Sequence, residues 1–157
     1  DVNLLINKII ENLSIKNKFF IGSSKGGYAA LYFGLDFKDS IIISGAPQYM
    51  LGNYLDYPNH KHILKYIMGD CSSNSINLLN DLMKNKLTNS QKNTNKIYLH
   101  YSNKEETYES DISLLIDKLK ALNFETYYDL KDYTSHSDLT NYFPKFIIST
   151  LLSYKVK

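Results

Sequence analysis

The feature that most restricts how this chain folds is the segment of residues 19–31, F-F-I-G-S-S-K-G-G-Y-A-A-L. Its first three residues form a short apolar run, which is typical of a buried strand and too brief for a helix. Two glycines then flank Ser24 in the pattern G-x-S-x-G. Residues 28–35 have the composition of a helix, with Ala29 and Ala30 where the helix would press on the strand. The segment therefore predicts a strand, a tight turn and a helix in direct succession.

A serine on a tight turn between a strand and a helix has the arrangement of a nucleophile elbow. The turn strains the serine backbone, so the neighbouring positions need to be nearly free of side chains, and Gly22 and Gly26 meet that need. The Ser24 hydroxyl then projects over the C-terminal edge of a parallel sheet, where the backbone N–H of Lys25 is placed to donate to an oxyanion. We predict Ser24 as the nucleophile and Lys25 as part of the oxyanion hole. Ser23 is the weaker candidate, because only Ser24 has a glycine two residues before it and another two residues after it.

Two other interpretations of this segment stay open. Residues 22–27, G-S-S-K-G-G, superficially resemble a phosphate-binding loop. That motif requires G-x-x-x-x-G-K-[ST], and here the lysine precedes the glycine pair, which disfavours phosphate binding. The segment could also be a tight strand-to-helix turn without any chemistry.

The composition describes one ordinary globular domain. With 157 residues, 43% of them hydrophobic and 22% charged, the chain is long enough to bury one core, and we expect a single domain over residues 1–157. A net charge of +2, with the lysines scattered, does not indicate nucleic-acid binding. There is no signal peptide and no apolar run near the ~18 residues of a membrane span, so we expect a cytoplasmic protein.

The single cysteine and three of the four histidines give no sign of a disulfide or a metal site. Cys71 has no partner for an internal disulfide. His60 and His62 form an H-x-H pair, which without a third ligand nearby is more often a surface feature than a metal site. His100 lies within an expected strand, where we expect a packed, hydrogen-bonded side chain. We therefore expect neither a metal nor a cofactor.

Helical and strand patterns alternate along the chain. The expected strands span residues 19–21, 40–44, 96–101 and 124–130, and the expected helices span 2–13, 28–35, 60–68, 75–87 and 108–122, with a final helix after the loop at 131–138. Gly34 is expected to stop the helix after the elbow, and Pro144 to lie in the first turn of the final helix. This alternation predicts right-handed crossovers and a mostly parallel sheet with helices on both faces.

Residues 47–95 interrupt the alternation between two consecutive strands. An insertion at that edge of a parallel sheet is most economically a helical lid over the site. Gln48 and Tyr49 open this insertion, where such folds place their ligands, so we predict that they bind substrate. Its tyrosines, which include Tyr54 and Tyr66, would suit a sugar-binding wall, although tyrosine is common throughout the chain.

Two later residues complete the arrangement that a catalytic serine needs. The serine requires a base to take its hydroxyl proton and an acid to hold the imidazole in the right tautomer. In a sheet of this kind the acid and then the histidine follow the serine, each after a later strand. Glu105 follows the third expected strand in the pattern S-x-x-E. In folds with a nucleophile elbow, the loop at this position commonly contains G-x-x-D. His136 follows the fourth expected strand. We predict Glu105 as the acid and His136 as the general base. Glu106 and Asp111 stay possible as the acid, and a solvated loop position is the alternative for His136.

With these residues in place, the sequence resembles the α/β-hydrolase superfamily over nearly the whole chain apart from the insertion. More narrowly, G-S-S-K-G-G-Y-A-A-L followed by I-S-G-A-P-Q-Y resembles bacterial proteins of capsular polysaccharide biosynthesis. It also resembles the accessory Sec-system protein that acetylates sugars on serine-rich adhesins. The resemblance implies a three-layer sandwich with a Ser–Glu–His site for acyl transfer or ester hydrolysis. The implied substrate is a small ester or an acylated bacterial glycan or glycoprotein.

A non-catalytic α/β-hydrolase-like module of a capsule-assembly or adhesin-export complex is the alternative. In the superfamily several strands precede the elbow, and an early loop gives the second oxyanion donor; neither is present in these 157 residues. We therefore expect the chain to be the C-terminal portion of the fold. An upstream segment or a second chain is expected to pair with the exposed edge of the elbow strand, because an unpaired apolar edge favours aggregation.

Overall fold

The structure, a computed structural model, describes residues 2–13, 15, 17–90 and 94–155. At its centre is a sheet of four strands in the order β1-β2-β3-β4, and every neighbouring pair is parallel. The strands are β1 (Phe19–Ser23), β2 (Ile41–Gly45), β3 (Lys96–Ser102) and β4 (Glu125–Lys131). All four overlap the strands expected from the sequence at 19–21, 40–44, 96–101 and 124–130. The predicted parallel α/β fold is confirmed.

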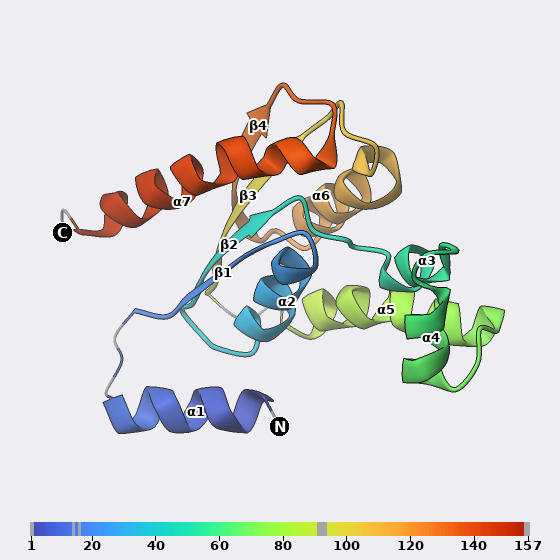
Figure 1. Cartoon of the computed structure of the whole chain (residues 1–157). Coiled ribbons are helices and arrows are strands. Elements are labelled where there is room, and N and C mark those ends of the chain that lie inside the picture. The colour runs from blue at the N-terminus through green and yellow to red at the C-terminus, as the bar shows by residue number, and fades with distance from the viewer. Residues whose placement is uncertain (1, 14, 16, 91–93, 156–157) are drawn as a thin grey trace.

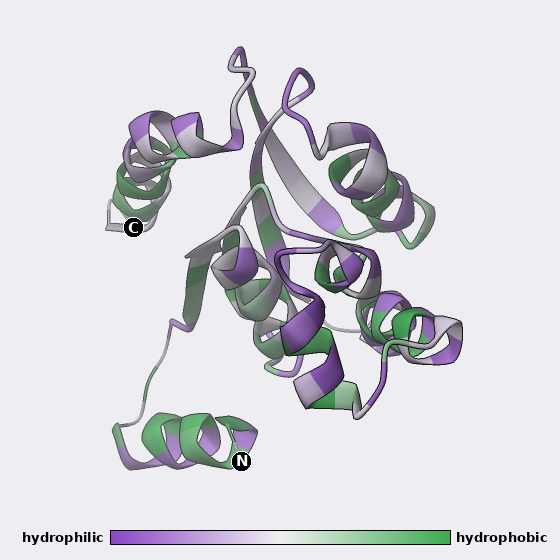
Figure 2. Ribbon diagram, turned by 45° about the vertical axis from the view of Figure 1, so that its right-hand side comes forward, coloured by the Kyte–Doolittle hydropathy of each residue, from purple (hydrophilic) through white to green (hydrophobic). Residues whose placement is uncertain are grey.

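Helices cover both faces of this sheet. One face carries α2 (Lys25–Gly34) and α6 (Ser113–Ala121), and the other carries α7 (Leu139–Lys155), which gives the predicted three layers (Figure 2). Every residue of β2 is buried, and Ile42 and Ile43 have no exposed surface. Because β2 is an inner strand covered on both faces, Ile41, Ile42 and Ile43 follow one another without a polar residue between them.

The helix after the elbow ends at Gly34, but not for the predicted reason. The next residue, Leu35, has right-handed helical angles, so the end is not a left-handed glycine cap. A Cβ atom on Gly34 would instead lie 2.7 Å from Ile42 Cγ1. The glycine is there because α2 packs closely against β2, a tertiary requirement that the helical pattern alone does not contain.

Two other helices also differ from the expectation. Pro144 is the sixth residue of α7, in its second turn rather than its first, because a 3₁₀ turn over His136–Asp138 leads into a helix that starts at Leu139. The helix expected at 108–122 begins as a π-helical turn, Tyr108–Ile112, and becomes α6 only from Ser113.

The insertion between β2 and β3 forms three helices, α3 (Leu51–Asp56), α4 (Lys61–Met68) and α5 (Ser73–Asn89), grouped at one end of the molecule (Figure 1). Sequence analysis missed α3, because six residues are too few to show a helical period. Leu55, Leu64 and Leu79 form a small core between these helices. Met83 of α5 belongs to the main core, so the insertion is anchored to the sheet through α5. Whether it acts as a lid stays a prediction.

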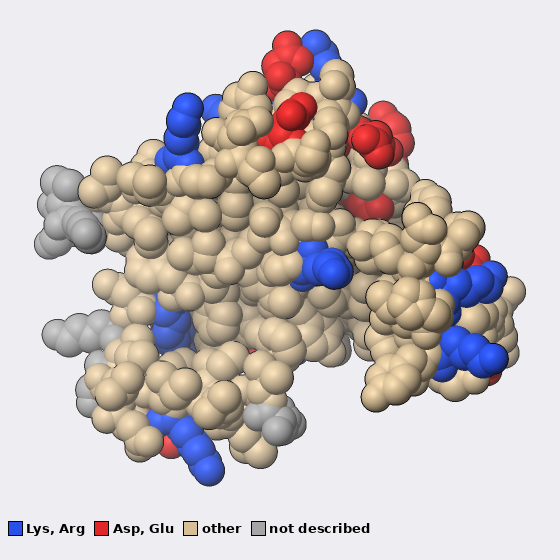
Figure 3. Space-filling model, in the orientation of Figure 1, with Lys and Arg blue, Asp and Glu red and all other residues tan. Residues whose placement is uncertain are grey.

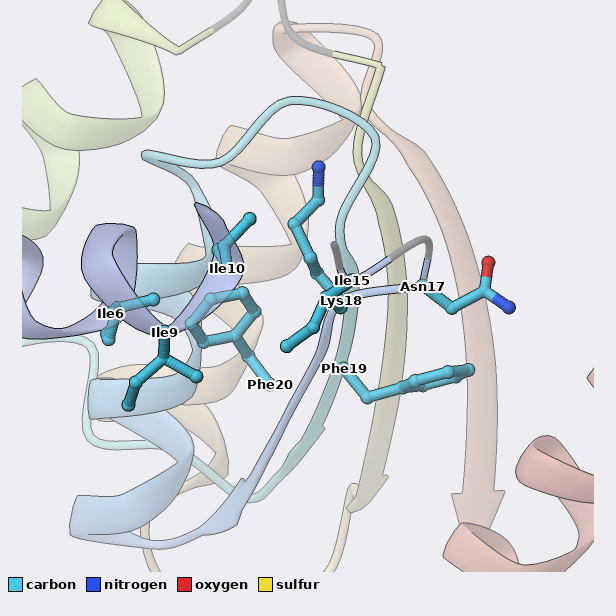
Figure 4. A pocket seen from close by; sticks show the side chains of 8 residues that line it. All are labelled: Ile6, Ile9, Ile10, Ile15, Asn17, Lys18, Phe19 and Phe20. Atoms are coloured by element: carbon cyan, nitrogen blue, oxygen red, sulfur yellow. The ribbon is translucent and has the colours of Figure 1, made fainter. Parts of the chain in front are cut away.

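The elbow strand β1 lies at the edge of the sheet, and no other described strand pairs with its outer side. Beside it lies α1 (Val2–Leu13), none of whose residues is buried. A cavity of about 430 Å³ separates the two, with Ile9 and Ile10 of α1 facing Phe20 (Figure 4). The expectation that another strand completes this edge stays a prediction.

Uncharged side chains cover most of the face drawn in Figure 3, and its lysines are spread singly or in small groups. Within the described part of the chain, no helix combines the length and the apolar character that crossing a bilayer demands.

The close packing of α2 gives a matched pair of substitutions. We expect Gly34→Ala to destabilise the fold by about 1–3 kcal/mol, because its new methyl group overlaps Ile42. Gly26→Ala in the same helix should be neutral or slightly stabilising, because its Cβ atom meets nothing within 4 Å and alanine favours the helix. Urea unfolding of both variants measures the difference, and equal stabilities would contradict the packing account.

Candidate active site

Ser24 lies at the junction of β1 and α2 in a strained conformation. Its angles are φ 54° and ψ −122°, and a positive φ in a residue other than glycine costs of order 1–3 kcal/mol. Two backbone hydrogen bonds hold the turn: Ser24 N donates to Gly45 O at 2.7 Å, and Tyr28 N donates to Ser24 O at 3.1 Å. The strand-to-helix turn predicted from G-x-S-x-G is present with the serine at its apex.

Of the two glycines that flank Ser24 in the motif, only Gly22 lies where a side chain has no space. A Cβ atom on Gly22 would lie 2.1 Å from the carbonyl oxygen of Gly26, so position 22 excludes any side chain, as predicted. Position 26 itself is open, and the prediction that it needs glycine for its own space is wrong. Gly27, outside the motif, is the constrained position, because its Cβ atom would lie 2.9 Å from Ser44 Oγ. Only the pairing of α2 with β2 reveals this.

Gln48 is hydrogen bonded to the predicted nucleophile. Its Nε2 donates to Ser24 Oγ at 2.9 Å, and the residue is only 4% exposed. Tyr49, the other predicted substrate-binding residue, is buried in the main core. The chain after Gln48 is fixed by Asp111, whose Oδ1 accepts from Met50 N at 2.6 Å.

His136 forms a pair with Glu105. The distance from His136 Nδ1 to Glu105 Oε1 is 3.5 Å, the long end of a hydrogen bond, and the Glu105 side chain is fully buried. Thr107 Oγ1 donates to the same carboxylate oxygen at 2.6 Å, which fixes its orientation. Of the three acids that the sequence left open, Glu106 is exposed and Asp111 bonds to Met50 and Ser110.

The pair shifts the proton affinity of the imidazole. The hydrogen bond to Glu105 raises the pKa of His136 above its ordinary value, and its partial burial opposes that change. Charge on the imidazole is therefore stabilised where a general base would acquire it. Burial, followed by the charge of Glu105, raises the pKa of the neighbouring Tyr133 phenol.

The link between Ser24 and His136 is not formed in this structure. Ser24 Oγ accepts from Gln48, and His136 Nε2 is buried with no hydrogen-bond partner among the described residues. Both residues follow the carboxyl ends of parallel strands, which share one edge of the sheet. Catalytic hydrogen bonds are often long or unmade without substrate and tighten when it binds.

Lys25 is the first residue of α2, directly after Ser24. The backbone N–H groups of the first helical turn have no partner within their helix, and they point toward the space beyond its N-terminus. The N–H of Lys25 therefore has no partner within α2, and its part in an oxyanion hole stays a prediction.

A second histidine–carboxylate pair lies within the sheet. His100 Nδ1 is 2.7 Å from Asp129 Oδ2, and the His100 side chain has no exposed surface. Here burial outweighs the carboxylate and lowers the pKa of the histidine. The prediction that His100 is a packed, hydrogen-bonded core residue is confirmed. No local pattern indicates its partner, because Asp129 meets His100 only through the register of β3 and β4.

The other histidine, cysteine and acidic side chains do not form a metal-binding cluster among the described residues. His60 is stacked on Tyr54, and its Nδ1 is 3.2 Å from the Tyr54 carbonyl oxygen. Among residues 2–13, 15, 17–90 and 94–155, no three His, Cys, Asp or Glu side chains lie close enough together to hold a metal ion.

Solved structures share this arrangement of strands and helices. The capsule O-acetyltransferase of Neisseria meningitidis serogroup A aligns over 96% of this chain and 63% of its own, with a TM-score of 0.80 and 22% identity. FphF, a fluorophosphonate-binding serine hydrolase of Staphylococcus aureus, aligns over 98% of this chain and 62% of its own, with a TM-score of 0.58 and 18% identity. The chain has an α/β-hydrolase fold.

A glycosylation-associated protein complex, Gap123 from Streptococcus agalactiae, aligns as well, over 96% of this chain and 31% of its own, with a TM-score of 0.79 and 19% identity. The chain thus spans between 31% and 63% of the lengths of these proteins. No protein-family model and no curated protein sequence matches it.

The two histidine–carboxylate pairs give opposite titrations. We expect NMR titration to place the pKa of His136 above 6.5 and that of His100 below it, because the hydrogen bond dominates at His136 and burial dominates at His100. Glu105→Gln should lower the pKa of His136, since it removes the charge that stabilises the imidazolium. Glu106→Gln should lower it less. An unchanged His136 pKa in Glu105→Gln would contradict the pairing.

Proposed function

We propose that this α/β-hydrolase chain catalyses serine-dependent acyl transfer or ester hydrolysis through Ser24, His136 and Glu105. The observation that carries the proposal is the strained serine at the same sheet edge as a histidine paired with a buried glutamate. Strain in a residue other than glycine persists only where the surrounding structure enforces it, and it concentrates at functional sites. The fold shared with an acetyltransferase and a serine hydrolase supports the same reaction class.

The hydrogen bonds of Ser24 are compatible with this chemistry. Gln48 Nε2 donates to Ser24 Oγ, so the serine keeps its own proton for His136 Nε2. Attack of Oγ on an ester carbonyl transfers that proton to His136, while the Lys25 N–H stabilises the oxyanion. His136 then protonates the leaving alcohol, which yields an acyl-serine. Water or a second hydroxyl gives its proton to His136 as it attacks the acyl-serine, and Ser24 recovers the proton.

The substrate proposed is an acyl, most simply acetyl, ester of a bacterial cell-surface glycan or glycoprotein. The printed names of the structural neighbours, a capsule O-acetyltransferase and a glycosylation-associated complex, support this choice. A cytoplasmic location and the lid role of α3–α5 stay predictions.

The unmade contact between Ser24 and His136 favours one alternative, a non-catalytic module that keeps the fold. A fluorophosphonate probe separates the two, because it reacts covalently with activated serines only. We expect mass spectrometry to find the label on Ser24. Intact protein without label after prolonged exposure would favour the non-catalytic module.

The glycine spacing assigns the nucleophile to one of two adjacent serines. We expect Ser24→Ala to abolish hydrolysis of a small ester such as p-nitrophenyl acetate, since the attacking oxygen is lost. Ser23→Ala should keep most of the rate, because Ser23 lies in β1 and not at the apex of the turn. Circular dichroism checks that both variants fold. Equal loss in both variants would argue against the elbow assignment.

The carboxylate that orients His136 is identified by a second pair of variants. We expect Glu105→Gln to reduce kcat by up to about 10⁴, the typical cost of losing a triad acid, because the imidazole loses its orienting charge. Glu106→Gln is the control, since that side chain is exposed, and its kcat should change by no more than a few-fold. If neither variant slows the reaction, the acid is assigned wrongly.

A further inference from the structure

The segment that follows β2 brings a side-chain amide to the predicted nucleophile. Gln48 Nε2 donates to Ser24 Oγ at 2.9 Å, and Ser24 N donates to Gly45 O at 2.7 Å. The elbow and the chain after β2 are therefore joined through the backbone and again through the Gln48 side chain. An amide NH₂ group carries two protons, so the bond to Oγ leaves Nε2 with a further N–H to donate.

The backbone on both sides of Gln48 is fixed. Ala46 has a φ of 39°, in the left-handed region, and it has no exposed surface. Its N–H donates to His100 O at 2.9 Å. Two residues after Gln48, Met50 N donates to Asp111 Oδ1 at 2.6 Å. Strain such as that at Ala46 concentrates at functional sites, because only the surrounding structure maintains it.

The stability of the fold does not explain an amide at position 48. The residue is only 4% exposed, and its Oε1 is buried without a hydrogen-bond partner among the described residues. An unsatisfied buried acceptor destabilises a folded protein, whereas an apolar side chain of the same shape would not. A buried polar atom of this kind is therefore explained better by the chemistry of the site than by packing.

Attack on an ester would place negative charge close to Gln48. Ser24 Oγ forms a bond to the carbonyl carbon, its proton passes to His136, and the π electron pair of the carbonyl moves onto the carbonyl oxygen. One carbon atom separates that oxyanion from Oγ, so a donor 2.9 Å from Oγ lies near the place that the oxyanion takes. Hydrogen bonds to an ionised acceptor are stronger than those to a neutral one. The oxyanion therefore attracts the Gln48 amide more strongly than the neutral Oγ does.

We propose that Gln48 Nε2 is an oxyanion donor, acting beside the predicted donor, the Lys25 N–H. Gln48 and Lys25 line the same cavity of about 270 Å³ between α2, α3 and α4. Nε2 donates to Oγ in the free protein and to the oxyanion in the transition state. When the tetrahedral intermediate collapses, the electron pair returns to the carbonyl and the leaving alcohol takes the proton from His136. The bond is strongest in the transition state, so it accelerates the reaction. This inference rests on the proposed function of Ser24.

The kinetic test replaces Gln48 with methionine, which has a similar length and no N–H. We expect Gln48→Met to lower kcat for p-nitrophenyl acetate about 10²–10³-fold, the typical cost of one lost oxyanion donor. KM should change by no more than a few-fold, because the lost bond belongs to the transition state. The midpoint of urea unfolding should stay the same or rise, since the unpaired Oε1 is removed as well. Thr150→Val, at a 5% exposed residue of α7, is the matched control and should keep kcat.

Three results of this assay would overturn the proposal. A higher KM with unchanged kcat would mean that Gln48 only binds the ester. An unchanged or higher kcat would mean that its hydrogen bond only restrains Ser24. A lower kcat together with a lower unfolding midpoint would mean that the residue supports the fold.

Gln48→Glu is a second variant that keeps the shape of the side chain. A carboxylate accepts hydrogen bonds and repels an oxyanion, so kcat should fall at least as far as in Gln48→Met. Retention of the wild-type rate in Gln48→Glu would mean that position 48 accepts the Ser24 proton, which also contradicts the proposal.

A transition-state analogue separates the inference from the function on which it rests. Trifluoroacetophenone forms an anionic hemiketal with an activated serine, and ¹⁹F NMR detects the adduct. We expect Gln48→Met to bind this ketone about 10²-fold more weakly than the wild type does. Equal binding, with ester hydrolysis by the wild type, would refute the inference and leave the serine chemistry standing. Weaker binding by the variant, without hydrolysis by the wild type, would support the inference and refute turnover. A wild type that reacts with neither compound would refute both.

Discussion

The close contact between the elbow turn, α2 and the sheet is the constraint on which the site depends. Gly22 lies close to Gly26, Gly27 to Ser44 and Gly34 to Ile42. At each of these places, a Cβ atom on the glycine would overlap its neighbour. The first two contacts place the start of α2 against the carboxyl ends of β1 and β2, and the third places the end of α2 against Ile42 of β2. The positive φ of Ser24 is the consequence, because the chain has to reverse within one residue between a buried strand and a tightly packed helix.

Burial decides how the two histidine–carboxylate pairs differ. Both histidines meet a carboxylate through Nδ1, yet the pKa shifts have opposite signs. His100 lies within the sheet and has lost all contact with water, so the neutral imidazole is favoured. The side chain of His136 is 29% exposed beyond the end of β4, so the carboxylate dominates and the charged form is favoured. The surroundings therefore stabilise the imidazolium at His136 and the neutral imidazole at His100.

The insertion between β2 and β3 reaches Ser24 through Gln48. Asp111, from the segment after β3, fixes Met50 at the start of α3. Gln48 is two residues earlier and is thereby held against Ser24. The loop before α3 therefore contacts the Ser24 hydroxyl and, with α2, α3 and α4, lines a cavity of about 270 Å³. Changes in α3 or α4 would alter that cavity without touching the strands that carry Ser24, Glu105 and His136.

The sequence by itself determined the strands, their parallel order and the elbow. A buried apolar run, a glycine-flanked serine and a helical stretch are local patterns, and local backbone preferences are enough to produce them. The positions of Glu105 and His136 after β3 and β4 followed from strand order alone. Tertiary structure decided which polar atoms meet: Gln48 with Ser24, Asp111 with Met50, and His100 with Asp129. These partners are 24, 61 and 29 residues apart in the chain. Such contacts depend on how the helices pack on the sheet, and so does the lack of space for a side chain at positions 27 and 34. Residues so far apart in the chain belong to no common local pattern, so the sequence alone does not predict that they meet.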